Sequence, residues 1–301
     1  DPYMTASGAR RAWVSLRRLE TLWFNTGTLC NLTCRHCYIE SSPKNDRIFY
    51  LSAAEVREYL DEIAALGLST RLIGFTGGEP FMNPELPAML EAALARGFHA
   101  LVLTNAMKPM KKQRPALLAL KERHGGRLQI RVSLDHYAAP VHQEERGKRS
   151  WQPTIEGLLW LAAEGFAVSV ASRRLSGEGE SAIRAGFARL FAELRLSLDA
   201  ADPQALTVFP EMDEKADVAE ITEACWGILG KSPESVMCSS SRMVIKRKGA
   251  ARPVVVACTL LPYDRQFELG ASLAEASRPV ALNHPHCAKF CVLGGGACSR
   301  G

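Results

Sequence analysis

The stretch from Leu29 to Tyr38 constrains this chain most, because it places Cys30, Cys34 and Cys37 in one short loop. Three residues separate the first pair of cysteines and two separate the second pair, so a single turn can direct three thiolates toward one centre. Iron–sulfur clusters are usually held by four thiolates. A site with three thiolates leaves one iron free to take a ligand from outside the protein, and we expect the chemistry to occur there.

A second motif follows a second apolar run. Residues 22–26 are apolar and aromatic enough for a buried strand that leads into the cysteine loop, and residues 71–76 form a similar run. The motif after that run is Gly77, Gly78, Glu79 and Pro80. The two motifs occur in this order, and each follows a predicted strand. This pattern resembles the signature of the radical S-adenosylmethionine (SAM) enzymes. In that family the open iron of a 4Fe-4S cluster chelates SAM, and an electron cleaves SAM to a 5′-deoxyadenosyl radical.

The resemblance implies a role for each motif residue. The two glycines let the backbone approach the methionine part of SAM, Glu79 accepts from its ammonium group, and Pro80 fixes the turn. The family's residue before the third cysteine is usually aromatic and lies near adenine; here it is His36, and Tyr38 follows the cysteine. The alternative is a structural zinc site made of the three cysteines and His36. That alternative leaves the glycine motif unexplained.

Strands and helices alternate from Leu22 onward. We predict strands at residues 22–26, 71–76, 99–105, 128–134, 166–171 and 205–209, and helices at residues 52–67, 83–97, 115–123, 153–164 and 180–194. Six βα units predict an α/β fold with an open, partial (β/α)6 TIM-type barrel. A closed eight-stranded barrel would need more chain than remains before the composition changes.

Polar residues follow the predicted strands, where βα barrels carry their working residues. They include Asn105, Ser133, Asp135, Ser172, Arg173 and Glu211. The resemblance makes Tyr38, Asn105 and Ser133 candidate SAM contacts, and it allows Arg146 or Arg173 to pair with the SAM carboxylate. A surface charge is the alternative for each arginine. The candidate catalytic residues are Tyr137, Glu211 and Cys298. The basic residues 107–114 are expected to form a solvated rim.

Five further cysteines gather near the end of the chain, after a single Cys225 in a helix predicted at residues 219–229. They are Cys238, Cys258, Cys287, Cys291 and Cys298. Residues 242–248 and 253–259 predict a β-hairpin that brings Cys238 and Cys258 to its open end. The pattern resembles the SPASM and twitch domains, and the cysteine count favours the twitch-like form with one auxiliary 4Fe-4S cluster. The preferred ligands are the first four cysteines, with Cys298 as a spare. A zinc knuckle is the alternative, and Cys225 is expected to be a buried small hydrophobe.

These features divide the chain into an N-terminal extension (1–20), a radical SAM barrel (21–212) and an auxiliary-cluster domain (213–301). Arg10, Arg11, Arg17 and Arg18 are expected on a solvated helical face.

The sequence has no run of about 18 apolar residues and no signal-peptide pattern, so we expect a cytoplasmic protein without membrane contact. Nine cysteines in that compartment favour metal over disulfides. The net charge of +5 and the low aromatic content do not predict nucleic-acid binding.

The expected function is abstraction of a hydrogen atom from a small-molecule substrate, followed by oxidation of the substrate radical through the auxiliary cluster. Maturation of a ribosomally made peptide is the alternative. Enzymes of that kind often carry an N-terminal leader-binding domain, whereas about twenty residues precede the first strand here. A non-catalytic electron carrier would not need residues 77–80. The family implies a flavodoxin or ferredoxin as reductant.

Overall fold

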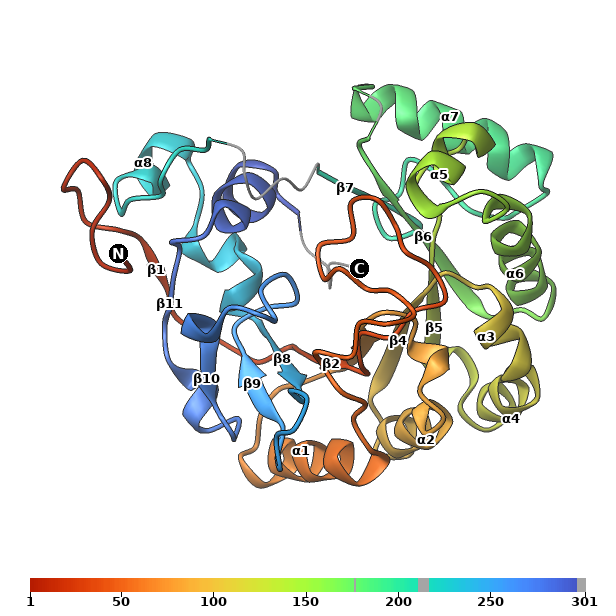
Figure 1. The fold of residues 1–301 in the computed structure, drawn as a ribbon, viewed down its shortest axis with the longest axis horizontal. Helices are drawn as coiled ribbons and strands as arrows, with labels where there is room; N and C mark the ends of the chain where they lie inside the picture. Colours follow the sequence, from red (N-terminus) through yellow and green to blue (C-terminus); the bar gives the residue numbers. More distant parts are fainter. Residues whose placement is uncertain (176, 211–216, 297–301) are drawn as a thin grey trace.

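The computed structural model describes residues 1–175, 177–210 and 217–296 (Figure 1). Its central feature is a nine-stranded sheet, in which six neighbouring parallel strands follow one another in chain order. These are β2 (Thr21–Asn25), β3 (Leu72–Thr76), β4 (His99–Thr104), β5 (Leu128–Ser133), β6 (Ala167–Arg173) and β7 (Leu206–Phe209). The predicted open (β/α)6 barrel is therefore confirmed.

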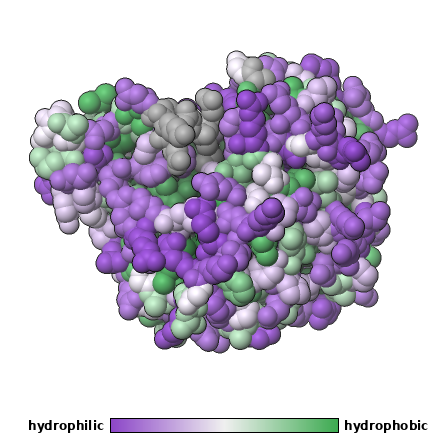
Figure 2. All heavy atoms as spheres, in the orientation of Figure 1, coloured by the Kyte–Doolittle hydropathy of each residue, from purple (hydrophilic) through white to green (hydrophobic). Residues whose placement is uncertain are grey.

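Helices follow the parallel strands and lie in an arc along one side of them (Figure 1). They are α1 (Ala53–Ala65), α2 (Leu86–Ala95), α4 (Arg114–His124), α6 (Trp151–Ala163) and α7 (Glu180–Glu193). Ser52 begins α1 with a capping box, in which its hydroxyl accepts from the Glu55 amide and the Glu55 carboxylate accepts from the Ser52 amide. The apolar sides of the helices pack on the sheet, and hydrophilic side chains cover most of the face shown in Figure 2.

Two short helices were not predicted from the sequence. They are α3 (Lys108–Lys112) and α5 (Ala139–Arg146). The lysines of α3 are exposed, as expected for a basic rim. Pro140 in the first turn of α5 and Gly147 after its last residue are ordinary start and stop signals, but the helix is short and mostly polar. An apolar pattern therefore could not reveal it.

The C-terminal part of the chain continues the same sheet. β8 (Ser241–Ile245) pairs antiparallel with β9 (Val254–Val256), which confirms the predicted hairpin, and β10 (Glu268–Gly270) follows at the edge. β8 also pairs in parallel with β2, the first barrel strand. One sheet therefore crosses the predicted boundary at residue 212, and the division of the chain into domains remains a prediction.

The N-terminal segment packs against the C-terminal part. β1 (Trp13–Val14) pairs with β11 (Val280–Ala281), and Arg11 lies buried with its guanidinium bound to the Glu220 carboxylate. The expected helical face is thus wrong, because residues 1–20 form turns, bridges and β1 in place of a helix. Arg10, Arg17 and Arg18 are exposed as expected, whereas Arg11 is buried. The helix predicted at 219–229 is also shorter than expected: α8 spans only Cys225–Leu229, and Cys225 is half-buried rather than buried.

The remaining helical turns are short. They are η1 (Pro80–Met82), η2 (Gly125–Arg127), η3 (Pro233–Ser235), η4 (Met237–Ser239), η5 (Arg265–Phe267), η6 (Glu275–Ser277) and the π-helix η7 (Cys287–Leu293). In the part of the chain that the structure describes, every helix is too short or too polar to cross a bilayer.

Candidate active site

A cavity of about 140 Å³ lies where the parallel strands end. Its lining includes the predicted site residues Cys30, Cys34, Cys37, Tyr38, Gly77, Gly78, Asn105, Ser133, Arg146 and Arg173. Apolar side chains complete the wall: Trp23, Leu103, Phe209, Leu260 and Phe290. The fold thus gathers residues from widely separated segments around one space.

The glycine turn packs against the backbone that leads into the cysteine loop. A Cβ atom added to Gly77, whose φ is +138°, would lie 2.4 Å from the carbonyl oxygen of Gly27. A Cβ atom on Gly78 would lie 2.2 Å from the carbonyl oxygen of Leu29, and the Glu79 amide donates to that oxygen at 3.0 Å. These glycines are therefore required by close contact between two backbone segments, a reason that the sequence analysis did not provide.

Glu79 is buried and bonded to the end of β4. One carboxylate oxygen accepts from the Thr104 hydroxyl at 2.7 Å, and the other accepts from the Asn105 amide at 2.8 Å. Burial raises the pKa of Glu79 to about 7. Glu79 and Pro80 are not among the residues that line the cavity. Glu79 thus ties the glycine turn to β4, and its bond to the SAM ammonium remains a prediction.

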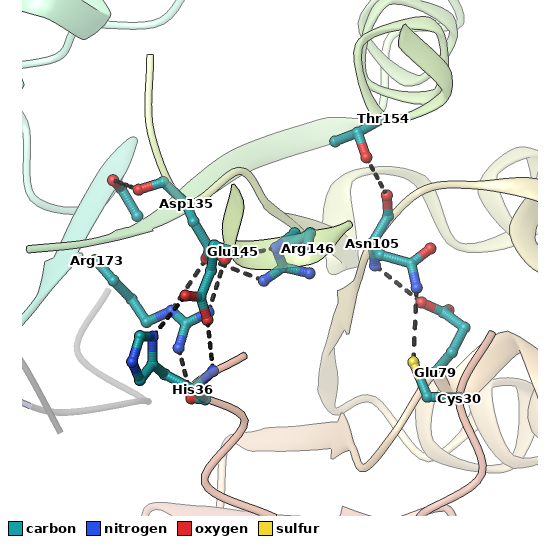
Figure 3. Close-up of polar contacts among 10 residues, drawn as sticks. Cys30, His36, Glu79, Asn105, Asp135, Glu145, Arg146, Thr154 and Arg173 are labelled. Atoms are coloured by element: carbon teal, nitrogen blue, oxygen red, sulfur yellow. Dashed lines mark hydrogen bonds and ion pairs between the residues drawn. The ribbon is translucent and has the colours of Figure 1, made fainter. Parts of the chain in front are cut away.

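Asn105 connects β4 to the cysteine loop (Figure 3). Its side-chain amide donates to the Asn31 side-chain oxygen at 2.9 Å and lies 4.0 Å from the Cys30 sulfur. Its backbone carbonyl accepts from the Thr154 hydroxyl of α6 at 3.1 Å. Asn105 is thereby fixed beside the first cysteine.

A buried carboxylate between two arginines forms the opposite wall (Figure 3). Asp135 accepts from Arg146 at 2.7 and 3.0 Å and from Arg173 at 2.7 and 3.1 Å, so each guanidinium binds it through two nitrogens. Burial alone would raise the pKa of Asp135, but the two guanidiniums outweigh burial and hold that pKa well below its ordinary value. Pairing of either arginine with the SAM carboxylate remains a prediction.

Glu145 extends this network to the cysteine loop, and the sequence analysis did not identify it. One of its carboxylate oxygens accepts from Arg173 at 2.8 Å and from the His36 amide at 2.9 Å, and the other lies 2.7 Å from His36 Nδ1 (Figure 3). The Glu145 carbonyl accepts from the Arg35 amide, and Arg173 also donates to the His36 carbonyl. The loop between Cys34 and Cys37 is therefore held from α5 and β6.

The family model described as the radical SAM superfamily matches residues 24–186, which extend from β2 through the first half of α7 and include both motifs. This chain belongs to the radical SAM superfamily. Its cofactors are accordingly SAM and a 4Fe-4S cluster. The cavity that holds the three motif cysteines, the glycine turn and the polar strand ends fits this pair of cofactors.

Two curated proteins illustrate the relationship of this radical SAM chain. The antilisterial bacteriocin subtilosin biosynthesis protein AlbA of Bacillus subtilis (strain 168) is 31% identical over 143 residues, which are 47% of this chain and 30% of AlbA. The Fe-coproporphyrin III synthase of Methanosarcina barkeri (strain Fusaro / DSM 804) is 28% identical over 150 residues, 49% of this chain and 35% of that protein. The chain thus spans about a third of the length of these curated relatives.

The fold is also similar to that of a solved radical SAM protein. SuiB of Streptococcus suis, in a crystal structure with bound S-adenosylmethionine, superposes with a TM-score of 0.61 at 12% identity. The superposition covers 84% of this chain and 63% of SuiB. At this identity the similarity supports the fold assignment.

Of the three candidate catalytic residues, only Tyr137 belongs to the part of the chain that the structure describes. The Tyr137 hydroxyl donates to Glu178 at 2.7 Å, and its ring packs on Gly186 of α7, where an added Cβ would lie 2.3 Å from the ring. Tyr137 is absent from the cavity lining. Glu211 and Cys298 lie outside the described residues.

A second, small cavity brings the predicted auxiliary ligands together. Its lining is otherwise apolar and includes Cys238, Cys258, Cys287 and Cys291. Cys238 and Cys258 lie at the open end of the β8–β9 hairpin, and the other two belong to η7. Burial raises the pKa of the Cys238 and Cys287 thiols to about 12.

Each of the two cavities is lined by its own set of cysteines. Within the described residues, no three His, Cys, Asp or Glu side chains converge closely enough to hold a single metal ion. A structural zinc ion needs four ligands at about 2.0–2.3 Å from one centre. A 4Fe-4S cluster takes one thiolate on each of its irons, so its ligands stand farther apart. Three thiols in the first cavity match a cluster with one open iron, and four thiols in the second match a cluster with complete thiolate ligation.

Proposed function

We propose that this chain carries the catalytic part of an enzyme that abstracts a hydrogen atom from a bound organic substrate. The single observation behind this proposal is the cavity that brings Cys30, Cys34 and Cys37 together with Ser133 and Arg146. When bound, the cluster and SAM supply a 5′-deoxyadenosyl radical as the hydrogen acceptor. A low-potential flavodoxin or ferredoxin is the proposed reductant.

The chain itself supplies binding, orientation and exclusion of water. We assign the three cysteines to the cluster, and Tyr38, the glycine turn, Asn105 and Ser133 to SAM. Asp135 holds Arg146 and Arg173 in place at this wall, and we assign one of the two to the SAM carboxylate. The apolar side of the cavity, with Trp23 and Phe290, limits access of water to a reactive intermediate.

Replacement of Cys34 by alanine is expected to abolish formation of 5′-deoxyadenosine, because the cluster loses one of three thiolates. The measurement is chromatography with mass spectrometry of reduced, reconstituted protein incubated with SAM. Cys225→Ala is the matched control, since Cys225 lines neither cavity, and it should retain the normal rate. A Cys34→Ala protein that cleaves SAM at the wild-type rate would exclude the assignment of this motif.

We further propose that Cys238, Cys258, Cys287 and Cys291 bind an auxiliary 4Fe-4S cluster. Their common cavity supports this set, and Cys298 remains a candidate spare ligand. Held by these residues, the cluster would supply a one-electron acceptor for the substrate radical, and the oxidised substrate would then release a proton. That outcome would make the enzyme an oxidoreductase.

The substrate class has two candidates. A small molecule is the first, and Fe-coproporphyrin III synthase is a relative named for such a product. A ribosomally made peptide is the second, and AlbA is a relative named for biosynthesis of a bacteriocin.

The two candidates can be distinguished by incubating the enzyme with an extract of the source organism grown in deuterated water. Abstraction from an extract component is expected to place deuterium in 5′-deoxyadenosine, which mass spectrometry detects. Protease treatment of the extract should leave the label unchanged for a small molecule and remove it for a peptide. Extract that is boiled in the same way but receives no protease is the control, because it shows whether handling alone removes the label. A small-molecule substrate would be established if the deuterium in 5′-deoxyadenosine persists after protease treatment but disappears when molecules below about 1 kDa are removed from the extract. Deuterium that disappears after protease treatment but persists after that removal would exclude a small molecule.

A further inference from the structure

Arg242 is a buried cation on β8. It is 1% exposed, and its guanidinium donates only to backbone carbonyls among the contacts described. Nε donates to Ala276 at 2.8 Å, Nη1 to Cys238 at 2.5 Å and to Ser241 at 2.8 Å, and Nη2 to Arg278 at 3.1 Å. No Asp or Glu within the described ranges forms an ion pair with it.

A buried charge without a counter-ion is costly, so buried cations are normally paired with an anion. Carbonyl dipoles compensate for part of this cost at Arg242. The guanidinium is tied directly to the second cavity, because it donates to the carbonyl of Cys238, and the thiols of Cys238 and Cys258 both interact with its charge. The anion that would complete this site is therefore one that binds between these cysteines.

We infer that Arg242 is the counter-charge of the auxiliary cluster and raises its reduction potential. The inference rests on the proposed cluster at Cys238, Cys258, Cys287 and Cys291. A 4Fe-4S cluster with four thiolates is negatively charged, and reduction adds one more negative charge. A fixed positive charge nearby stabilises the reduced form more than the oxidised form, so it shifts the potential upward. Arg242 is a positioning residue in this sense, since it acts through the cluster.

The charges at the first cavity are arranged differently. Arg146 and Arg173 are neutralised there by Asp135 and Glu145, and a third buried carboxylate, Glu79, lies on the Asn105 side of the site. The first cavity thus has no surplus of buried positive charge among these groups, whereas the second has Arg242. This difference favours electron acceptance at the auxiliary site, which is the direction that substrate oxidation requires.

The test compares Arg242→Gln with Arg242→Lys. Both side chains are shorter than arginine and donate hydrogen bonds to carbonyls, but only lysine keeps the charge. Both changes are made in the full chain with Cys30, Cys34 and Cys37 replaced by alanine, so that one cluster remains. Iron is measured first, and the potential is then determined by redox titration followed by electron paramagnetic resonance. Arg247→Gln is the control, because Arg247 lies at the turn end of the hairpin and pairs with Glu268.

The glutamine variant is expected to favour the oxidised form about tenfold more than the parent, which is a shift of about 59 mV to more negative potential for one electron. The lysine variant and the Arg247 control should stay near the parent. Equal potentials in the glutamine and lysine variants, each with about four irons, would overturn the inference. If the Arg242→Gln protein does not retain the cluster, the inference requires that the Arg242→Lys protein does. Equal loss of iron in both variants also overturns the inference. A parent protein without iron would instead refute the proposed auxiliary cluster itself.

Discussion

Anaerobically reconstituted protein is expected to contain about eight irons, and a variant with Cys30, Cys34 and Cys37 replaced by alanine is expected to contain about four. The reason is that two separate cavities each carry their own cysteines, with no cysteine shared between them. Iron and sulfide analysis together with Mössbauer spectroscopy would measure this difference. The remaining irons should form one cluster with complete thiolate ligation.

The reciprocal variant tests the second half of the same expectation. Alanine at Cys238, Cys258, Cys287 and Cys291 should leave about four irons and should preserve SAM cleavage, because the first cavity is unchanged. Cys225→Ala should keep all the iron. A fall from about four irons to none in the first variant, with zinc bound by the C-terminal thiols, would leave a single-cluster enzyme and remove the support for substrate oxidation.

Features that depend on residues close together in the chain were predictable from the sequence. The capping box at Ser52 and the apolar strand patterns depend on residues a few positions apart, so the order of the βα units could be read directly. The cysteine spacing and residues 77–80 identified the family for the same reason. The rule that polar residues collect at the ends of parallel strands predicted one site for Asn105 and Ser133, and both line the cavity that contains the motif cysteines.

Features that depend on distant pairing were not predictable in this way. The contact of His36 with Glu145 joins residues 109 positions apart, and Glu145 lies in a short polar helix without an apolar pattern. The parallel pairing of β8 with β2 likewise has no local signal. In the sequence, Arg242 is one polar residue at the start of a strand, and its burial among backbone carbonyls is visible only in three dimensions.

Replacement of Asp135 by asparagine is expected to lower the free energy of unfolding by about 3–5 kcal/mol, because it leaves two buried guanidiniums facing each other without their shared anion. Denaturant unfolding of the cluster-free protein at pH 7 would measure this change. Asp61→Asn is the matched control: Asp61 pairs with Arg96 at the surface, and the expected loss is within about 1 kcal/mol. Similar losses in the two variants would contradict the structural role of the buried network.

The pH dependence gives a second signature of the same carboxylate. The pKa of Asp135 is depressed in the folded protein, so its stabilising contribution is fully present above the unfolded value of about 4. The contribution is lost as the pH falls below that value toward the folded pKa. Wild-type stability should therefore decrease more steeply below about pH 4 than that of the asparagine variant.

Because Arg173 links Asp135 to Glu145 and to the backbone of His36, replacement of Asp135 by asparagine should also loosen the loop between Cys34 and Cys37. Faster amide hydrogen exchange in residues 35–37, with unchanged exchange in α1, would show that the network orders the cysteine loop.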